Sequence, residues 1–262
     1  MKRIGNIYAQ ITSLKNIQEA DAKAQRGKSN QYGVLLHNQN KEGNLLILQD
    51  MLVSKTYRTS EYDIFNIHEP KERTVYRLPY FPDRITHHAI MNVLEPIFVS
   101  TFTADTYSCI KKRGIHKLLR NLKHDLKDVS GTTYCLKFDI KKFYPSIDHH
   151  TLKTLLRRKF KDQDLLWLLD EIIDSAPGLP IGNYLSQYLA NFYLTPEEMK
   201  KQLEELLHIL HNMRFYQKYW HEHFGYNARE RKDAWEQKAD EKLNSFNLTA
   251  HNKTKPIQVS SK

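Results

Sequence analysis

Apolar and polar side chains alternate over one stretch near the middle of the chain. From Tyr134 to Ile140 the even-numbered positions are apolar, and Asp139 falls among the odd-numbered ones. A period of two is typical of a half-buried strand, so Asp139 is predicted on the face opposite the apolar one, at the end of the strand. Pro145 breaks the pattern, and Asp148 is predicted to cap a helix that follows.

The rest of the chain mostly shows helical spacing of apolar residues. A charged turn around Pro70 separates two segments that favour a β-hairpin, residues 57–67 and 74–79. Asp83 is predicted to cap the helix that begins at Arg84. The predicted helical segments are 1–31, 44–55, 84–96, 115–127, 149–160, 164–173, 184–194, 196–210 and 229–243.

Charge and composition narrow the class of partner. The chain has 262 residues, 40% of them hydrophobic, a formal charge of +10 and a pI near 9.3. This length suits one large domain or two small ones, and the basic excess favours a polyanion such as nucleic acid. The two cysteines lack metal-site spacing, and no apolar run is long enough for export or for spanning a membrane. A cytoplasmic protein without a membrane partner is therefore expected.

The basic residues are concentrated before the predicted strand. From Cys109 to Lys127 there are seven Lys or Arg residues against a single acid, Asp125. Gly114 is expected to allow a turn, so that the N-terminus of the next helix forms a phosphate cradle beside Lys112 and Arg113. A phosphate-facing segment and a merely solvated basic helix face both fit this pattern.

The order Phe138-Asp-Ile, Phe143-Tyr144, Ser146-Ile147-Asp148 closely resembles the palm motif of reverse transcriptases. The resemblance implies that Asp139 binds catalytic Mg²⁺, with Mn²⁺ as a substitute, and that Ile140 offers its backbone carbonyl. It also implies that Tyr144, five residues after the acid, excludes a ribose 2′-hydroxyl. Asp148 is interpreted as a structural cap without a catalytic role.

Three further segments are similar to reverse transcriptase motifs in the matching order: Arg77–Phe98, Asp105–His116 and Leu179–Leu194. Ser186-Gln187 stands where most bacterial enzymes have Ser-Pro, which resembles the enzymes of diversity-generating retroelements and their group II intron-like relatives. The resemblance implies two groups of contacts. Nucleotide-binding residues would be Arg77, Lys112, Arg113, Tyr144 and Gln187, and template-binding residues would be Gly182, Lys111 and Lys117.

The resemblance stops after Leu194, because the expected Tyr-x-Asp-Asp motif and a thumb are missing. Two-metal phosphoryl transfer needs carboxylates that hold two ions about 3.5–4 Å apart, and one Asp does not suffice. Tyr219-Trp-His-Glu222 falls roughly where the missing motif would lie, so His221 and Glu222 are candidate ligands. Asp240-Glu241 is a weaker candidate.

Together these patterns predict an α/β (α+β) protein with a right-hand polymerase fold. Its fingers would comprise residues 1–130, its partial palm 131–194, and a helical C-terminal extension 195–262. The expected activity is RNA-directed DNA synthesis from deoxynucleotides on a DNA or RNA primer, in a bacterial retroelement. Two alternatives remain: an inactive remnant that binds nucleic acid, and a module that binds an accessory protein through the C-terminal helices.

Overall fold

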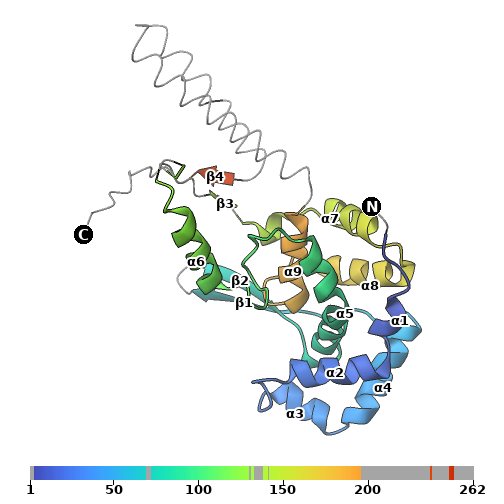
Figure 1. The fold of residues 1–262 in the computed structure, drawn as a ribbon. Helices are drawn as coiled ribbons and strands as arrows, with labels where there is room; N and C mark the ends of the chain where they lie inside the picture. Colours follow the sequence, from blue (N-terminus) through green and yellow to red (C-terminus); the bar gives the residue numbers. More distant parts are fainter. Residues whose placement is uncertain are drawn as a thin grey trace, which may run out of the picture. The chain divides into compact units, whose positions relative to one another are not determined.

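The computed structural model describes residues 3–68, 72–129, 131–132, 138–140, 142–195, 237 and 248–250. Within this part, helices dominate and two small antiparallel sheets complete an α+β structure (Figure 1). The chain divides into two compact units, one made of residues 1–110 and 144–195 and the other of residues 111–143 and 196–262. The predicted boundaries of fingers, palm and extension stay a prediction.

Helix α5 (Ile85–Thr101) is the centre of the first unit. It packs against α1 (Tyr8–Ile11), α2 (Leu14–Ala24) and α9 (Tyr184–Tyr193) (Figure 1). Phe98 of α5 is fully buried, with its ring centroid 5.3 Å from that of Phe192 and 6.1 Å from that of Phe160. Such aromatic clusters contribute beyond their buried area, so these three rings help to fix α9 on α5.

Two more helices, α3 (Tyr32–Asn38) and α4 (Lys41–Val53), complete the N-terminal part of this unit. A buried carboxylate, Asp21, joins them to α2 and to the turn η1 (Tyr80–Arg84). Asp21 accepts a hydrogen bond from the Tyr80 hydroxyl and lies 2.7 Å from the Lys41 ammonium group. Burial alone would raise the pKa of Asp21, but these partners outweigh it and lower the pKa. The carboxylate therefore remains charged and ties four elements together.

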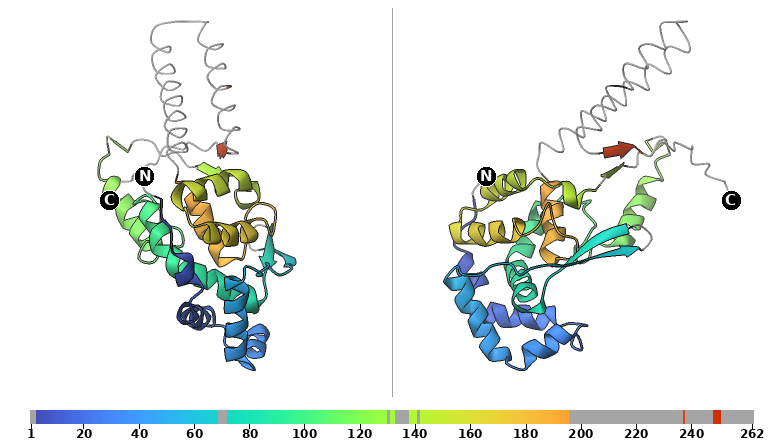
Figure 2. Two further views of the ribbon diagram at one scale, coloured as in Figure 1. Left: turned by 90° about the vertical axis from the view of Figure 1, so that its right-hand side faces the viewer. Right: turned by 180° about the vertical axis from the view of Figure 1, so that it is seen from behind.

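Strands β1 (Asp63–His68) and β2 (Glu72–Arg77) form the predicted antiparallel hairpin, in which Asp63 pairs with Arg77. The hairpin projects from the helices of the first unit (Figure 2). Most of its residues are exposed, and Val75 and Tyr76 near its base are partly covered. The hairpin thus presents its side chains to solvent while its base is attached to the helical body.

Helices α7 (His149–Lys159) and α8 (Gln163–Ile173) begin with the same kind of cap. Asp148 accepts a hydrogen bond from the Thr151 N–H at 2.7 Å, which confirms the predicted cap. Asp162 caps α8 and also accepts from the backbone N–H groups of Ile7 and Tyr8, at 2.8 and 3.0 Å. One carboxylate therefore starts α8 and anchors the N-terminal segment.

We expect Asp162→Ala to lower the free energy of unfolding by roughly 2–3 kcal/mol, against about 1 kcal/mol for Asp148→Ala. The difference arises because Ile7 and Tyr8 would lose their acceptor as well. Urea unfolding of both variants measures it, and equal losses would contradict the anchoring role.

The same two carboxylates predict a pH dependence. Burial would raise the pKa of Asp162, but the backbone N–H donors outweigh it and lower the pKa, and the Thr151 hydrogen bonds lower that of Asp148. Because the folded pKa is depressed, the stabilisation is complete above the ordinary Asp pKa of about 3.9. It is lost as the pH falls through the lower folded pKa.

The second unit contains α6 (Ile115–Asp125) and a two-stranded sheet of β3 (Phe138–Ile140) and β4 (Leu248–Ala250). No residue of α6 is buried, although Ile115, Leu118, Leu119 and Leu122 lie at helical spacing. The basic helix was therefore predicted correctly, and its apolar stripe is exposed.

The predicted Asp83 cap is wrong, and the turn expected before α6 is present with another residue in the left-handed conformation. Asp83 does not cap α5, because the turn η1 runs directly into that helix. Asp83 is instead buried, and it accepts hydrogen bonds from the Tyr57 hydroxyl and the Ser60 N–H at 2.8 and 3.1 Å. Gly114 has an ordinary φ of −90°, and the left-handed residue of that turn is Lys112, with φ 64°.

Most of the predicted helices before Thr195 are confirmed with shifted ends, and the 1–31 segment is broken into α1 and α2. The predicted helices at 196–210 and 229–243 lie outside the described residues, apart from Gln237. Among the described helices, none combines the length and the apolar character needed to cross a membrane.

Candidate active site

The turn that carries Tyr144 is fixed to a loop more than thirty residues further along the chain. This turn, η2 (Tyr144–Ser146), receives a hydrogen bond from the Leu179 N–H to the Tyr144 carbonyl at 2.9 Å. Gly178 has φ +62°, and a Cβ there would lie 2.5 Å from the same carbonyl oxygen. Only glycine fits this position without displacement, so the loop after α8 sets where the Tyr144 backbone lies.

The side chain of Tyr144 is half-buried in this arrangement. Burial raises the pKa of its hydroxyl, and the Cys109 charge adds to the rise. The phenol is therefore neutral at physiological pH. The role of this neutral, half-buried ring as a steric gate stays a prediction.

Gly182 lies against the base of the hairpin. It has φ +118°, and a Cβ there would lie 2.7 Å from the carbonyl oxygen of Tyr76 and 3.2 Å from a methyl carbon of Val75. The Tyr76 N–H donates to the carbonyl of Ile181 at 2.8 Å. The close approach that this glycine allows is thus to β2 of the same chain, and its contact with a template stays a prediction.

Arg77 follows Tyr76 on β2 and points into solvent. Its guanidinium forms an ion pair with Asp63, its cross-strand partner, and lies 5.3 Å from the centre of the Phe65 ring. The side chains of Arg77 and Asp63 are 64% and 57% exposed. Exposed pairs of this kind contribute about 0–1 kcal/mol, so an anionic ligand can displace Asp63 at little cost.

Gln187 is on the outward face of α9. Its neighbours Ser186 and Tyr188 are buried against the core, whereas Gln187 is exposed. Tyr188 also donates a hydrogen bond to Glu95 of α5 at 3.0 Å, which fixes the rotation of α9 about its axis. The side chain of Gln187 is consequently available to a ligand on that face.

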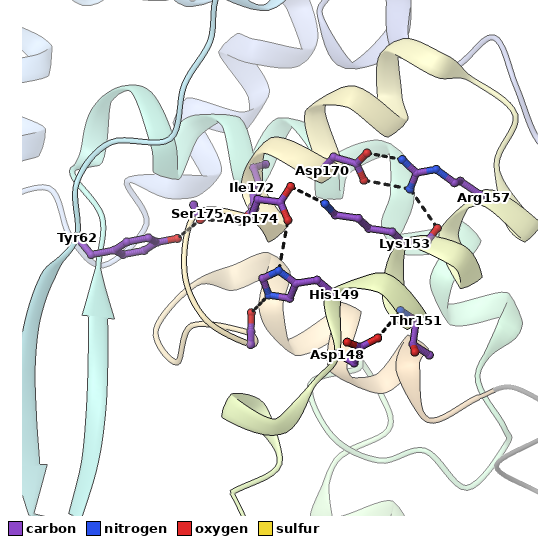
Figure 3. A network of polar contacts seen from close by, with 11 residues as sticks. Tyr62, Asp148, His149, Thr151, Lys153, Arg157, Asp170, Ile172, Asp174 and Ser175 are labelled. Atoms are coloured by element: carbon purple, nitrogen blue, oxygen red, sulfur yellow. Dashed lines mark hydrogen bonds and ion pairs between the residues drawn. The ribbon is translucent and has the colours of Figure 1, made fainter.

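A polar network supports the loop that contains Gly178 (Figure 3). His149, the first residue of α7, lies with its Nε2 2.8 Å from the Gly178 carbonyl and its Nδ1 3.3 Å from Asp174. Lys153 forms an ion pair with the same Asp174. Sequence patterns did not single out these residues, because their link to the Tyr144 turn exists only across packed helices.

A second set of polar contacts joins the loop to the base of the hairpin. The Tyr62 hydroxyl lies 2.7 Å from the Ser175 hydroxyl (Figure 3). It also accepts a hydrogen bond from the Asn183 amide at 3.1 Å. An open hollow of about 530 Å³ lies here, lined by Thr59, Ser60, Glu61, Tyr62, Ile64, Tyr76, Glu171, Asp174, Ser175, Ala176 and Pro177. The loop is therefore held on both sides, by α7 and by the hairpin.

The remaining predicted site residues belong to the second unit. Asp139 is the central residue of β3 and pairs with Thr249 of β4. Lys111 and Lys112 are exposed, while Arg113 and Lys117 are partly covered at the start of α6. The structure thus brings Arg77, Tyr144, Gly182 and Gln187 onto connected elements of the first unit, and it places the acid and the basic segment in the second.

The donors in the described part do not complete a metal site. In this part of the chain, no group of three or more His, Cys, Asp or Glu residues is arranged to hold a metal ion. The strand beside Asp139 is Leu-Thr-Ala, which offers no carboxylate. The candidate ligands His221, Glu222, Asp240 and Glu241 lie outside the described residues.

Comparison with known proteins supports a reverse-transcriptase-like relationship over part of the chain, through matches to a group II intron-encoded protein and to an intron maturase. The protein YkfC of Escherichia coli (strain K12) is 26% identical over 166 residues, which are 57% of this chain and 43% of YkfC. The group II intron-encoded protein LtrA of Lactococcus lactis subsp. cremoris is 28% identical over 128 residues, 45% of this chain and 21% of LtrA.

A third relative is the nuclear intron maturase 1, mitochondrial, of Arabidopsis thaliana, which is 24% identical over 92 residues. That match covers 35% of this chain and 12% of the maturase. No family model matches the chain. The chain spans less than half the length of these curated relatives. For this chain, the activities of the full-length relatives are therefore proposals.

Proposed function

We propose that this chain works as a reverse transcriptase that adds deoxynucleotides to a DNA or RNA primer on an RNA template. The right-hand polymerase fold, with fingers and a partial palm, is part of the same proposal. The observation that carries it is the pair of backbone links, Tyr76 to Ile181 and Leu179 to Tyr144. They join three segments that resemble separate reverse transcriptase motifs, as a common nucleotide site requires.

In this proposal Asp139 and the Ile140 carbonyl hold Mg²⁺ or Mn²⁺, and Glu222 is the candidate second carboxylate. The metal, when bound, stabilises charge on the reacting phosphate oxygens. Tyr144 excludes a 2′-hydroxyl. The other roles follow from the motif resemblance: Arg77, Lys112, Arg113 and Gln187 position the nucleotide, and Lys111, Lys117 and Gly182 contact the template.

Primer extension by the purified chain tests this function. The assay contains an RNA template, an annealed primer, the four deoxynucleotides and Mg²⁺ or Mn²⁺. Extension beyond the primer supports the proposal, provided that it is lost in Asp139→Ala. Tight template binding without any extension would reject synthesis by this chain alone.

A second candidate function is RNA binding without catalysis. It is favoured by the lack of a metal-holding cluster in the described part of the chain and by the carboxylate-free strand beside Asp139. In this case the fingers and the exposed face of α9 bind a template. Any catalysis would have to be supplied by another polypeptide. A module that binds an accessory protein through residues 195–262 is a separate candidate, and it predicts no affinity for RNA.

Both RNA-binding functions predict a role for the basic segment before α6. We expect the double variant Lys112→Ala/Arg113→Ala to weaken RNA binding about tenfold at moderate salt, because two phosphate contacts are lost. The slope of log K against log salt should fall by about 1.4–1.8. Fluorescence anisotropy at several salt concentrations measures both quantities. Lys15→Ala/Arg26→Ala, on exposed positions of the first unit, is the control; equal weakening in the control would contradict the assignment.

The ion pair between Arg77 and Asp63 predicts a gain in nucleotide affinity on mutation. Asp63→Asn removes the competing carboxylate, so we expect a roughly two- to fivefold tighter complex with a deoxynucleoside triphosphate. The free energy of unfolding should change by less than about 1 kcal/mol. Titration of a fluorescent nucleotide measures the affinity. Glu72→Gln, an equal charge change on the same hairpin, controls for general electrostatics; an unchanged affinity in Asp63→Asn would remove Arg77 from the nucleotide site.

A further inference from the structure

A second basic surface lies on α7 and is formed by residues other than those assigned above. It is an open groove of about 550 Å³ lined by Arg3, Thr154, Arg157 and Arg158. Three of its four lining side chains carry a positive charge, and none is acidic. Both of its components, the N-terminal segment and α7, belong to the first unit.

The backbone brings these charges together. The Ile4 N–H donates to the Lys159 carbonyl at 2.9 Å, and the Lys161 N–H donates to the Ile4 carbonyl at 2.8 Å. The hydrogen bonds from the Ile7 and Tyr8 N–H groups to Asp162 fix the same N-terminal segment three to four residues after Ile4. Arg3 is thereby held beside the last turn of α7, and its guanidinium donates to the Arg157 carbonyl at 3.4 Å.

Acidic side chains neutralise only part of the positive charge around this groove. Arg157 makes two hydrogen bonds to Asp170, and this ion pair raises its pKa (Figure 3). Arg3 and Arg158 are exposed, and neither forms an ion pair with a described residue. Lys159 and Lys161, next in the chain, likewise have no acidic partner within the described part. Like charges repel, so a fold that fixes them side by side has preorganised a site for anions.

We propose that this groove binds the sugar-phosphate backbone of a nucleic acid, as a second anchor separate from the proposed polymerase site. An open groove buries little of a small anion, so useful affinity requires a polyanion that makes several contacts at once. Arginine favours this role because its planar fork binds phosphate oxygens in pairs. Apolar side chains for insertion into a lipid surface are not among the lining residues.

A nucleic acid that binds in this groove and at the Tyr144 turn must be long enough to contact both. Helix α7 starts three residues after η2, and its rise of 1.5 Å per residue places Arg158 about 14 Å along the axis from His149. This distance corresponds to about four steps of 3.4 Å along a nucleic acid strand. An oligonucleotide held at the Tyr144 turn must therefore exceed a few nucleotides before it can also reach the groove.

The test is the double variant Arg3→Glu/Arg158→Glu, compared with Lys15→Glu/Arg26→Glu, which makes the same change in charge at exposed positions outside the groove. Anisotropy titrations use labelled single-stranded RNA of about 3 and about 20 nucleotides at several salt concentrations, because about 3 nucleotides are too short to span about 14 Å. For the long RNA, we expect the groove variant to bind at least about tenfold more weakly, with a salt slope lower by about 1.4. For the short RNA we expect less than a twofold change, and the control should bind both nearly normally.

Three results would overturn the proposal: equal losses in the two variants, equal losses for the two RNA lengths, or unchanged binding of the long RNA. Vesicles of phosphatidylserine and phosphatidylcholine, and inorganic phosphate as a competitor, form further arms. Vesicle binding that depends on Arg3 and Arg158 would assign the groove to lipid instead, and displacement of RNA by millimolar phosphate would assign it to a small anion. If Arg3→Glu/Arg158→Glu unfolds, Arg3→Ala/Arg158→Ala takes its place with the same expected direction. Because the readout is binding, loss of the proposed synthesis activity leaves this test intact.

Discussion

Replacement of Asp139 with Ala is expected to abolish primer extension on an RNA template. In the proposed site this carboxylate would hold metal ions, which would supply several kcal/mol of charge stabilisation at the reacting phosphate. Since each 1.36 kcal/mol corresponds to a factor of ten in rate, we expect a loss of at least about a thousandfold. RNA affinity should stay within about twofold, because an acid makes no favourable contact with phosphate.

Two comparisons make this experiment decisive. Asp50→Ala removes an exposed acid of α4 and should extend primers at the rate of the unmodified chain. Extension that persists in Asp139→Ala would remove Asp139 from the catalytic site. If the unmodified chain extends and Asp139→Ala does not, Glu222→Gln examines the candidate second carboxylate. An unchanged rate of primer extension in Glu222→Gln would show that another residue supplies the second metal-binding carboxylate.

Gly178→Ala is expected to destabilise the first unit and to disturb selection against ribonucleotides. Its φ of +62° costs an Ala about 1–2 kcal/mol, and the new Cβ would lie 2.5 Å from the Tyr144 carbonyl. Because backbone atoms surround the position, relief requires movement of the η2 turn. We expect a loss of about 3 kcal/mol or more in the free energy of unfolding. We also expect at least a tenfold fall in the preference for deoxynucleotides over ribonucleotides, about 1.4 kcal/mol.

Gly27→Ala provides a matched control for Gly178→Ala. Gly27 has nearly the same φ, +69°, but nothing lies within 4 Å of its Cβ position. Gly27→Ala therefore costs only the strain of an alanine in the left-handed conformation, about 1–2 kcal/mol. It should leave nucleotide selection unchanged. Urea unfolding and incorporation assays compare the two. Equal destabilisation in both variants would mean that the Tyr144 turn is not set by the loop at Gly178.

Local patterns predicted the secondary structure of the described part well. The helical spacing around Leu152, the cap at Asp148 and the hairpin on either side of Pro70 depend on residues close in sequence, and the structure contains all three elements. The failures concern the break between α1 and α2 and the cap expected at Asp83. Asp83 looks like a cap in sequence, but its carboxylate is used by Tyr57 and Ser60, which no local pattern connects to it.

The sequence by itself therefore determined the order and type of the elements, the basic character of the segment before α6, and the motif resemblance that Asp139, Tyr144 and Gln187 carry. The relationship to group II intron-encoded proteins over part of the chain agrees with that resemblance. These properties follow from periodicity, charge and residue identity, which are local quantities.

Only the tertiary structure decided which distant segments meet. It linked Gly178 to Tyr144 and Gly182 to β2, and it placed Arg3 beside Arg158 on α7. Each contact joins residues far apart in the chain and depends on the packing of helices on one another and on backbone groups that need partners. Those requirements are satisfied only when the whole unit is packed, so neither the support of the Tyr144 turn by the Gly178 loop nor the basic groove can be predicted from a local pattern.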